Sequence, residues 1–330
     1  MIGIDQSSAD TSQKVTHSFS SHDPLSLKKR KQDFLAALRS TGKLEYKRYL
    51  ASPLRYAGGK SLAVGLVIEK IPETVQRVAS PFIGGGAIEI ALARELGIKV
   101  HAYDVFDILC SYWKVQLSSP KALARRLRAF TPDRSSFSSV KTRLAAHWKN
   151  GEKLNRFDLA AHYYFNSNTS YGPHFLGWPS DIYLNTERYA KMVDKVESFN
   201  AQGLSVQCSD FKRVIIQHSN DFLYCDPPYY LEEGNTFCGM YPHRNFPIHH
   251  KGFRHDVLRD LLLQHKGGFI LSYNDCSVIR DWYSDCQIET PEWQYTFGQG
   301  DTRIGETRKN LNGGSHIKKS HELLIWRMPG

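Results

Sequence analysis

The sequence predicts an α/β fold in which a long, mainly helical insertion interrupts the sheet. Residues 76–104 run through a short apolar strand (76–80), a glycine turn (84–86), a helix (87–96) and a second strand (99–103) that ends at Asp104, which is the pattern of a βαβ unit. Residues 108–199 are then helical or irregular. Strand-like runs return only after this stretch, at residues 204–207, 221–225, 269–273 and 322–326, and a helix is predicted at residues 255–264. The insertion therefore divides one sheet into two sequence segments.

The N-terminal region differs in composition from the rest of the chain. Residues 1–24 are rich in Ser, Thr, Asp and Gln and have few apolar positions, which predicts disorder. The basic run at residues 28–31 (KKRK) suits a nuclear address, a DNA-contacting arm or the solvated start of a helix. The apolar residues at 34–38 favour the helix. We expect residues 1–50 to form a disordered leader followed by a basic helix.

The charge of the chain is concentrated in one segment. The 330 residues include 43 Lys and Arg against 33 Asp and Glu, which gives a net charge of +10. Residues 114–156 hold eleven basic and two acidic residues, so their net charge of +9 is nearly the whole excess. Such a segment suits a polyanionic partner, although a solvated basic helix face gives the same pattern.

Cysteine usage and hydropathy exclude several protein classes. The six cysteines show no C-x-x-C spacing, which argues against a zinc site and against a disulfide framework. A membrane-spanning helix needs about 20 consecutive apolar residues, and no apolar stretch of the sequence approaches that length. The N-terminus does not resemble a signal peptide. We expect a cytoplasmic protein in a reducing compartment, with no metal and no membrane partner.

The segment 226–229 (DPPY) follows the apolar run 221–225 and is the most informative motif. Prolines disfavour helix and commit the backbone after a strand to an extended course that leaves its carbonyls free to accept hydrogen bonds. Asp226 and the Pro227 carbonyl are then suited to hold an amino group while Tyr229 stacks on the ring that carries it. An ordinary turn is the alternative, because four residues alone are weak evidence.

Two glycine-containing segments suit a ligand with a nucleoside and a carboxylated tail, although a tight structural turn and the start of a helix are the respective alternatives. Residues 80–86 (SPFIGGG) lie between a predicted strand and a predicted helix, so the backbone can approach a ligand closely near a helix N-terminus. The sequence fits neither G-x-G-x-x-G nor the P-loop pattern. Asp104 ends the next strand, where a carboxylate can bind ribose hydroxyls. Residues 55–60 (RYAGGK) add a lysine beside two glycines.

The order of these motifs resembles that of the Dam-like family of S-adenosylmethionine-dependent DNA adenine-N6 methyltransferases. Residues 55–60 match the opening [WY]-A-G-G-K of that family, residues 81–86 match P-F-x-G-x-G, and residues 226–229 match its DPPY motif. The stretch 163–172 (YYFNSNTSYG) and the closing segment 310–325 are also similar. Residues 164–180 depart from the more polar and basic recognition hairpin of the family, which leaves the target sequence open.

The resemblance implies a role for each matching residue. Asp226, Pro227 and Tyr229 would act on the target adenine without a covalent enzyme intermediate. The cofactor S-adenosyl-L-methionine would contact Tyr56, Gly59, Lys60, Pro81, Phe82, Gly84, Gly86, Asp104, Asp210, Phe211 and Asp226. The inserted segment would contact double-stranded DNA through Arg125, Arg126, Arg128, Lys141, Arg143, Asn168, Ser170 and Tyr171.

The resemblance also implies a domain organisation and a partner. It predicts a Rossmann-like methyltransferase sheet with helices on both faces, formed by residues 51–110 and 200–330, and a target-recognition domain at residues 111–199. A flipped adenine in duplex DNA is the expected substrate, and a cognate restriction endonuclease is a candidate partner. Adenine-N6 methylation of ribosomal RNA, N4-cytosine methylation and a catalytically inactive DNA-binding relative remain as alternatives.

Overall fold

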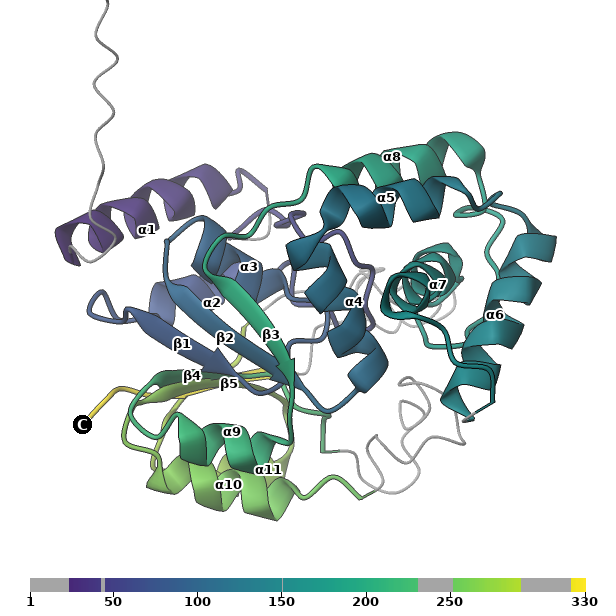
Figure 1. Cartoon of the computed structure of the whole chain (residues 1–330). Coiled ribbons are helices and arrows are strands. Elements are labelled where there is room, and N and C mark those ends of the chain that lie inside the picture. The colour runs from purple at the N-terminus through teal and green to yellow at the C-terminus, as the bar shows by residue number, and fades with distance from the viewer. Residues whose placement is uncertain (1–23, 43–44, 150, 231–251, 292–321) are drawn as a thin grey trace, which may run out of the picture.

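A seven-stranded sheet forms the centre of the computed structural model, which describes residues 24–42, 45–149, 151–230, 252–291 and 322–330 (Figure 1). The strand order is β3-β2-β1-β4-β5-β7-β6; the first five strands are parallel, and β7 is antiparallel to both neighbours. The strands are β1 (Arg77–Ser80), β2 (Lys99–Asp104), β3 (Leu204–Cys208), β4 (Phe222–Cys225), β5 (Phe269–Asn274), β6 (Gln287–Glu289) and β7 (Glu322–Arg327).

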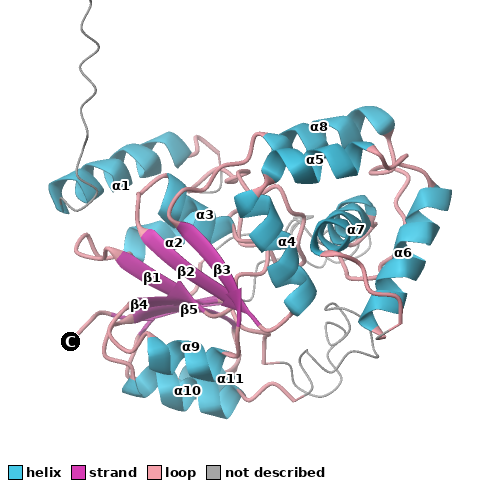
Figure 2. Cartoon of the chain, viewed as in Figure 1, coloured by secondary structure: helices cyan, strands magenta, loops and turns pink. Residues whose placement is uncertain are grey.

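Helices cover both faces of the sheet, as predicted (Figure 2). One face carries α2 (Val64–Lys70), α3 (Ala87–Arg94) and α4 (Asp107–Ser118), with α1 (Pro24–Leu38) packed on α2. The other face carries α9 (Phe211–Gln217), α10 (His255–Gln264) and α11 (Ser277–Trp282). One cluster of buried apolar side chains lies on each side of the sheet, between the sheet and its helices. The sheet is therefore the middle layer of a three-layer α/β structure.

The segment that interrupts the sheet is helical. It contains α5 (Pro120–Arg128), α6 (Arg134–Trp148), α7 (Arg156–Thr169) and α8 (Thr186–Glu197). Local sequence explains where three of these helices begin, because Asp133, Asn155 and Asn185 each accept hydrogen bonds from backbone amides of the first turn. Helix α7 packs on α4, which in turn packs on β3, and one cluster of buried residues continues from the sheet into these helices.

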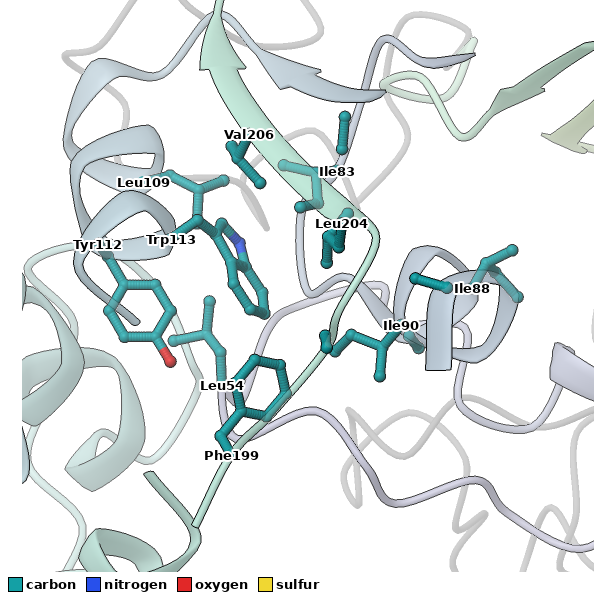
Figure 3. Close-up of a cluster of buried hydrophobic side chains, with 14 of the residues drawn as sticks. Leu54, Ile83, Ile88, Ile90, Leu109, Tyr112, Trp113, Phe199, Leu204 and Val206 are labelled. Carbon is teal, nitrogen blue, oxygen red and sulfur yellow. The ribbon is translucent and has the colours of Figure 1, made fainter. Parts of the chain in front are cut away.

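Trp113 of α4 connects this core to the glycine turn after β1. The ring lies among apolar side chains of α4 and β3, beside Leu109 and Val206 (Figure 3). Its indole Nε1 donates a hydrogen bond to the carbonyl of Gly84, with an N–O distance of 3.0 Å. A Cβ atom added to Gly86 would lie 2.9 Å from the same ring. The packed core therefore fixes the position of the turn.

The structure confirms most of the predicted elements and adds several. Helix α10 begins and ends at the predicted residues, and the strands of the βαβ unit lie within a residue of their predicted bounds. Helices α9 and α11 and the edge strand β6 were not predicted. Residues 1–23 of the predicted leader lie outside the described residues. Among the residues that are described, none of the helices has the length and apolar character that a membrane span requires.

Candidate active site

A cavity of about 300 Å³ opens at the carboxyl ends of β1, β2 and β4. The chain leaves the adjacent strands β1 and β4 toward opposite halves of the sheet, and such a switch point is where parallel sheets bind ligands. Every residue predicted from the resemblance to contact the cofactor lines this cavity: Tyr56, Gly59, Lys60, Pro81, Phe82, Gly84, Gly86, Asp104, Asp210, Phe211 and Asp226. The fold thus brings residues from five separate parts of the sequence to one place.

The glycine turn forms one wall of the cavity with its backbone. Gly84 and Gly86 have φ angles of 45° and 69°, a conformation that side chains with a Cβ rarely adopt. A Cβ on Gly84 would lie 2.9 Å from the Tyr56 ring, so Tyr56 packs directly on the turn. Gly86 is the N-cap of α3, which directs the amino end of that helix at the cavity.

Asp104 is the last residue of β2, and Asp210 lies two residues beyond the end of β3. The Asp104 carboxylate accepts hydrogen bonds from the amides of Gly84 and Phe106, at 3.3 and 3.0 Å, and its burial raises its pKa to about 6. Asp210 caps α9 by accepting a hydrogen bond from the Lys212 amide at 2.9 Å. Two carboxylates held by backbone amides therefore face the same cavity.

Aromatic side chains close another part of the cavity. The rings of Phe82 and Phe211 have centroids 5.8 Å apart, and Phe253 lies 5.8 Å from the first and 5.1 Å from the second. Val105 also lines the cavity and is 54% exposed, so it offers an apolar surface to a ligand. Neither Phe253 nor Val105 was predicted from the sequence, since Phe253 belongs to none of the matched motifs.

A partly buried ion pair joins two of the predicted motifs. The Lys60 Nζ lies 2.7 Å from Oδ1 and 2.9 Å from Oδ2 of Asp226, and it also donates to the Gly58 carbonyl at 3.2 Å. The Lys60 side chain is 4% exposed and that of Asp226 22%. Burial raises the pKa of the Asp226 carboxyl, while the Lys60 charge opposes this rise. Lys60 therefore favours the ionised form of Asp226.

The residues after Asp226 are held against strand β5. The Tyr229 ring stacks on Tyr273 with centroids 6.0 Å apart and an interplanar angle of 27°, and the Lys60 Nζ lies 5.1 Å from the Tyr229 centroid. The Asn274 amide donates to the Tyr230 carbonyl at 2.6 Å. These contacts fix the course of the backbone after the two prolines and place Tyr229 beside the ion pair.

Glu89 is a further acidic side chain on the cavity wall. It lies in the first turn of α3, is 1% exposed, and accepts a hydrogen bond from the Ser80 hydroxyl at 2.6 Å. Glu89 belongs to none of the matched motifs, and its position in the sequence predicted only a place in the helix after the glycine turn. A carboxyl group within the otherwise apolar sequence AIEIALA was the signal that would have identified it.

Two residues predicted to contact DNA are buried instead. Asn168 is 1% exposed; its Oδ1 accepts from the Arg55 amide at 3.0 Å and its Nδ2 donates to the Pro53 carbonyl at 3.1 Å. Ser170 is fully buried and donates to the Asn166 carbonyl. In this structure both side chains form hydrogen bonds within the protein, and neither is exposed at a surface that a DNA duplex could contact. Tyr171, the next residue, is 67% exposed.

Several of the predicted DNA-binding arginines pair with acidic side chains of the protein. Arg126 pairs with Asp158, and Arg143 with Glu152. Arg128 pairs with both Asp194 and Glu197 of α8. Arg125 is exposed on the same helix, and no ion pair involves it within the described part of the chain. The charge that the sequence concentrates in residues 114–156 is therefore partly neutralised by the fold.

A tight loop beside the cavity presents aromatic side chains to solvent. Ser170 and Pro179 form an isolated bridge, and the Tyr171 amide donates to the Trp178 carbonyl at 2.8 Å. Trp178 is 75% exposed, with the Lys141 Nζ 4.9 Å from its ring. The Arg55 guanidinium donates a hydrogen bond to the Ser170 carbonyl, and Arg55 directly precedes the cavity residue Tyr56, so this contact connects the loop to the cavity wall.

Within the described ranges, no group of His, Cys, Asp or Glu side chains is arranged to bind a metal ion.

Comparison with known proteins agrees with the motifs and with the cavity. A family model described as D12 class N6 adenine-specific DNA methyltransferase matches residues 56–297, which include most of the cavity and the insertion. The type II methyltransferase M.FokI of Planomicrobium okeanokoites is 23% identical over 289 residues, which cover 82% of this chain and 44% of M.FokI. The type II methyltransferase M1.LlaDCHI of Lactococcus lactis subsp. cremoris is 24% identical over 264 residues, covering 76% of this chain and 91% of that protein.

These matches confirm the resemblance found in the sequence, although the chain spans less than half the length of M.FokI. The family model covers well over half of the chain and includes Lys60, the glycine turn, Asp104 and Asp226. The chain belongs to the D12 class N6 adenine-specific DNA methyltransferase family.

Proposed function

We propose that this protein is a site-specific DNA methyltransferase that transfers a methyl group from S-adenosyl-L-methionine to the N6 amino group of adenine in duplex DNA. The observation that carries the proposal is the position of Asp226 and Lys60. Their ion pair lies at the carboxyl end of β4, on the wall of the cavity formed by the glycine turn. The Asp226 carboxylate, which can accept hydrogen bonds from the amino group of a target base, thus lies beside a cavity large enough for the cofactor.

The cavity residues fit S-adenosylmethionine. The carboxylate of Asp104 is suited to bind the two ribose hydroxyls, and Phe82, Phe211 and Val105 give an apolar site for the adenine ring. The glycine turn lets the backbone approach the amino acid end of the ligand. When bound, this cofactor supplies a methyl group on a positively charged sulfur, which is a strong electrophile.

Asp226 and its neighbours would prepare the target amino group. The lone pair of the adenine N6 is delocalised into the ring, which makes the nitrogen a weak nucleophile. Hydrogen bonds from the N6 amino group to the Asp226 carboxylate and the Pro227 carbonyl would orient it and draw electron density back to the nitrogen. Tyr229 would stack on the base, which must leave the duplex to reach this depth.

The insertion at residues 111–199 is proposed as the target-recognition domain. Its link to the cavity supports this assignment, because the loop with Tyr171 and Trp178 is tied through Arg55 to the cavity residue Tyr56. The related M.FokI and M1.LlaDCHI are named as type II methyltransferases, so we also propose a cognate restriction endonuclease as a functional partner.

Radioactive methyl transfer tests the proposal directly. We expect label from S-adenosylmethionine to enter N6-methyladenine in duplex DNA and not ribosomal RNA. Asp226→Ala should abolish transfer, while binding to nonspecific duplex DNA remains within about twofold because phosphate contacts dominate that binding. Asp281→Ala, which changes an exposed carboxylate in α11, is the control. Label that enters only RNA, or turnover by the Asp226 variant, would refute the proposal.

A further inference from the structure

Glu89 has no role in the function proposed above, although it lies on the wall of the same cavity. It lies three residues after Gly86, the last glycine of the turn. The Ser80 hydroxyl at the end of β1 donates a hydrogen bond to the Glu89 Oε1, with an O–O distance of 2.6 Å. Burying a carboxyl group is costly unless polar groups compensate it. The position of Glu89 in a cofactor cavity therefore calls for an explanation.

The charges around Glu89 favour a cationic ligand. Lys60 and Asp226 interact electrostatically with the Glu89 carboxyl, and Tyr224 of β4 interacts with all three side chains. Lys60 and Asp226 neutralise each other through their ion pair. Burial, with a smaller contribution from the charge of Asp226, raises the pKa of Glu89 to about 8, although the hydrogen bond from Ser80 and the charge of Lys60 oppose the rise. At neutral pH the carboxyl is mostly uncharged, and an adjacent cation would make it ionise.

The proposed function identifies which cation this would be. The amino acid end of S-adenosylmethionine carries a carboxylate and an ammonium on the same carbon atom. The glycine turn and the amino end of α3 suit the carboxylate, because backbone amides and the helix dipole favour a negative charge there. Glu89 lies in the first turn of that helix, so its carboxyl is within the same part of the cavity.

Resting on the proposed function, we propose that Glu89 binds the α-ammonium group of S-adenosylmethionine and releases its own proton to solvent as the ligand binds. One proton leaves the Glu89 carboxyl, and an ion pair with the ligand ammonium forms. Ser80 holds the carboxyl in position in both states through its hydroxyl.

Ligand affinities of Glu89→Gln test this inference without using turnover. Glutamine has the size of the protonated acid and can still accept the Ser80 hydrogen bond, so the fold should be retained. We expect the Kd for S-adenosylmethionine and for S-adenosylhomocysteine, which both carry the ammonium, to rise about tenfold or more. The Kd for 5′-methylthioadenosine, which lacks the amino acid end, should stay unchanged. Glu95→Gln, at the opposite end of α3 and outside the cavity, should leave all three affinities unchanged.

Calorimetry supplies an independent readout. Titration with S-adenosylhomocysteine at pH 7, in buffers of different ionisation enthalpy, reports the number of protons released on binding. We expect close to one proton from the wild-type protein and a clearly smaller number from Glu89→Gln. The amino group of the free ligand is already protonated at pH 7, so it cannot take up the proton that the wild-type protein releases, and that proton goes to the buffer.

The outcomes separate this inference from the proposed function. If the wild-type protein binds none of the three nucleosides, the proposed function fails and the inference fails with it. If the wild-type protein binds them and Glu89→Gln binds all three with unchanged affinity, only the inference is refuted. A loss confined to S-adenosylmethionine would assign Glu89 to the sulfonium, and an equal loss for 5′-methylthioadenosine would show a merely structural role; either result overturns the inference.

Discussion

At Asp226, two opposing effects set the charge that the proposed reaction needs. The carboxyl is surrounded by protein, which raises its pKa and favours the neutral acid, and the Lys60 ammonium 2.7 Å away favours the carboxylate. A neutral carboxylic acid would be a weaker acceptor for an amino group. In the proposed reaction, Lys60 would therefore act on the target base through Asp226, in addition to lining the cofactor cavity.

Replacing Lys60 by methionine should move the pH dependence of the reaction. Without the ammonium, the pKa of Asp226 rises, and activity that requires the carboxylate is lost as pH falls through that higher value. We expect the acidic limb of the kcat/KM profile to shift to higher pH by about one unit or more. Part of the lost activity should return at alkaline pH.

Lys70→Met is the matched control for this experiment, because Lys70 pairs with Glu289 away from the cavity. Its profile should overlay that of the wild-type protein. If Lys60→Met lowers kcat/KM equally at every pH, then Lys60 does not act through the ionisation of Asp226.

The glycine turn between β1 and α3 requires both a positive φ angle and close packing against Tyr56. Two alanine substitutions distinguish these requirements. Gly84 has positive φ and touches Tyr56, whereas Gly203 has a φ of 91° and its added Cβ would come no closer than 3.4 Å to the Ile98 carbonyl. Alanine at either position should cost about 1–2 kcal/mol of unfolding free energy through backbone strain. Only Gly84→Ala should also weaken S-adenosylmethionine binding, because the Tyr56 ring must move.

Urea unfolding and ligand titration of the two glycine variants measure the two effects separately. Equal cofactor affinities for Gly84→Ala and Gly203→Ala would show that close packing of Tyr56 on the turn is unimportant for binding.

The end of α7 shows how burial changes the interpretation of a polar motif. Asn168 bonds to the Arg55 amide and the Pro53 carbonyl, so Asn168→Ala leaves two backbone groups of the loop before Tyr56 without these partners. We expect a loss of about 2–4 kcal/mol in the free energy of unfolding, measured by urea denaturation. Asn200→Ala, at an exposed position, should change it by less than about 0.5 kcal/mol. A fully stable Asn168→Ala with impaired DNA binding would instead support direct contact with DNA.

How well the sequence predicted each element depended on how local its signal was. The strands β1 and β2 and the helix α10 carry their apolar pattern and turn residues within a few positions, so their bounds were close. The strand β6 has three residues and exists through pairing with β7, which lies far along the chain. No local pattern marks such an edge strand.

The candidate site follows the same rule. Motif residues at the ends of strands come to line one cavity, because parallel strands carry their carboxyl ends to one edge of the sheet. The contact between Lys60 and Asp226 joins residues 166 positions apart, and motif order alone does not show that they form an ion pair. Likewise, the local sequence of residues 163–172 does not show that the Asn168 side chain is buried and that of Tyr171 exposed.

Across the whole molecule, the fold redistributes the charge that the sequence concentrates in the insertion. Acidic residues of α7 and α8 come to lie beside arginines of α5, so part of the excess positive charge is already paired within the protein. A paired arginine has less to gain from a phosphate, because it must first give up its carboxylate partners. Net charge of a segment therefore overstates its capacity to bind DNA.

Arg125 and Arg128 test this argument on a single helix. Both are exposed on α5, but Arg128 pairs with Asp194 and Glu197, whereas no ion pair involves Arg125 among the residues that the structure describes. For binding to nonspecific duplex DNA, we expect Arg125→Ala to reduce the slope of log K against log salt concentration by about 0.9, the value of one phosphate contact. Arg128→Ala should reduce the slope by clearly less, since its charge is already neutralised. Equal reductions would mean that the intramolecular pairs open when DNA binds, and unchanged slopes in both variants would place α5 outside the DNA interface.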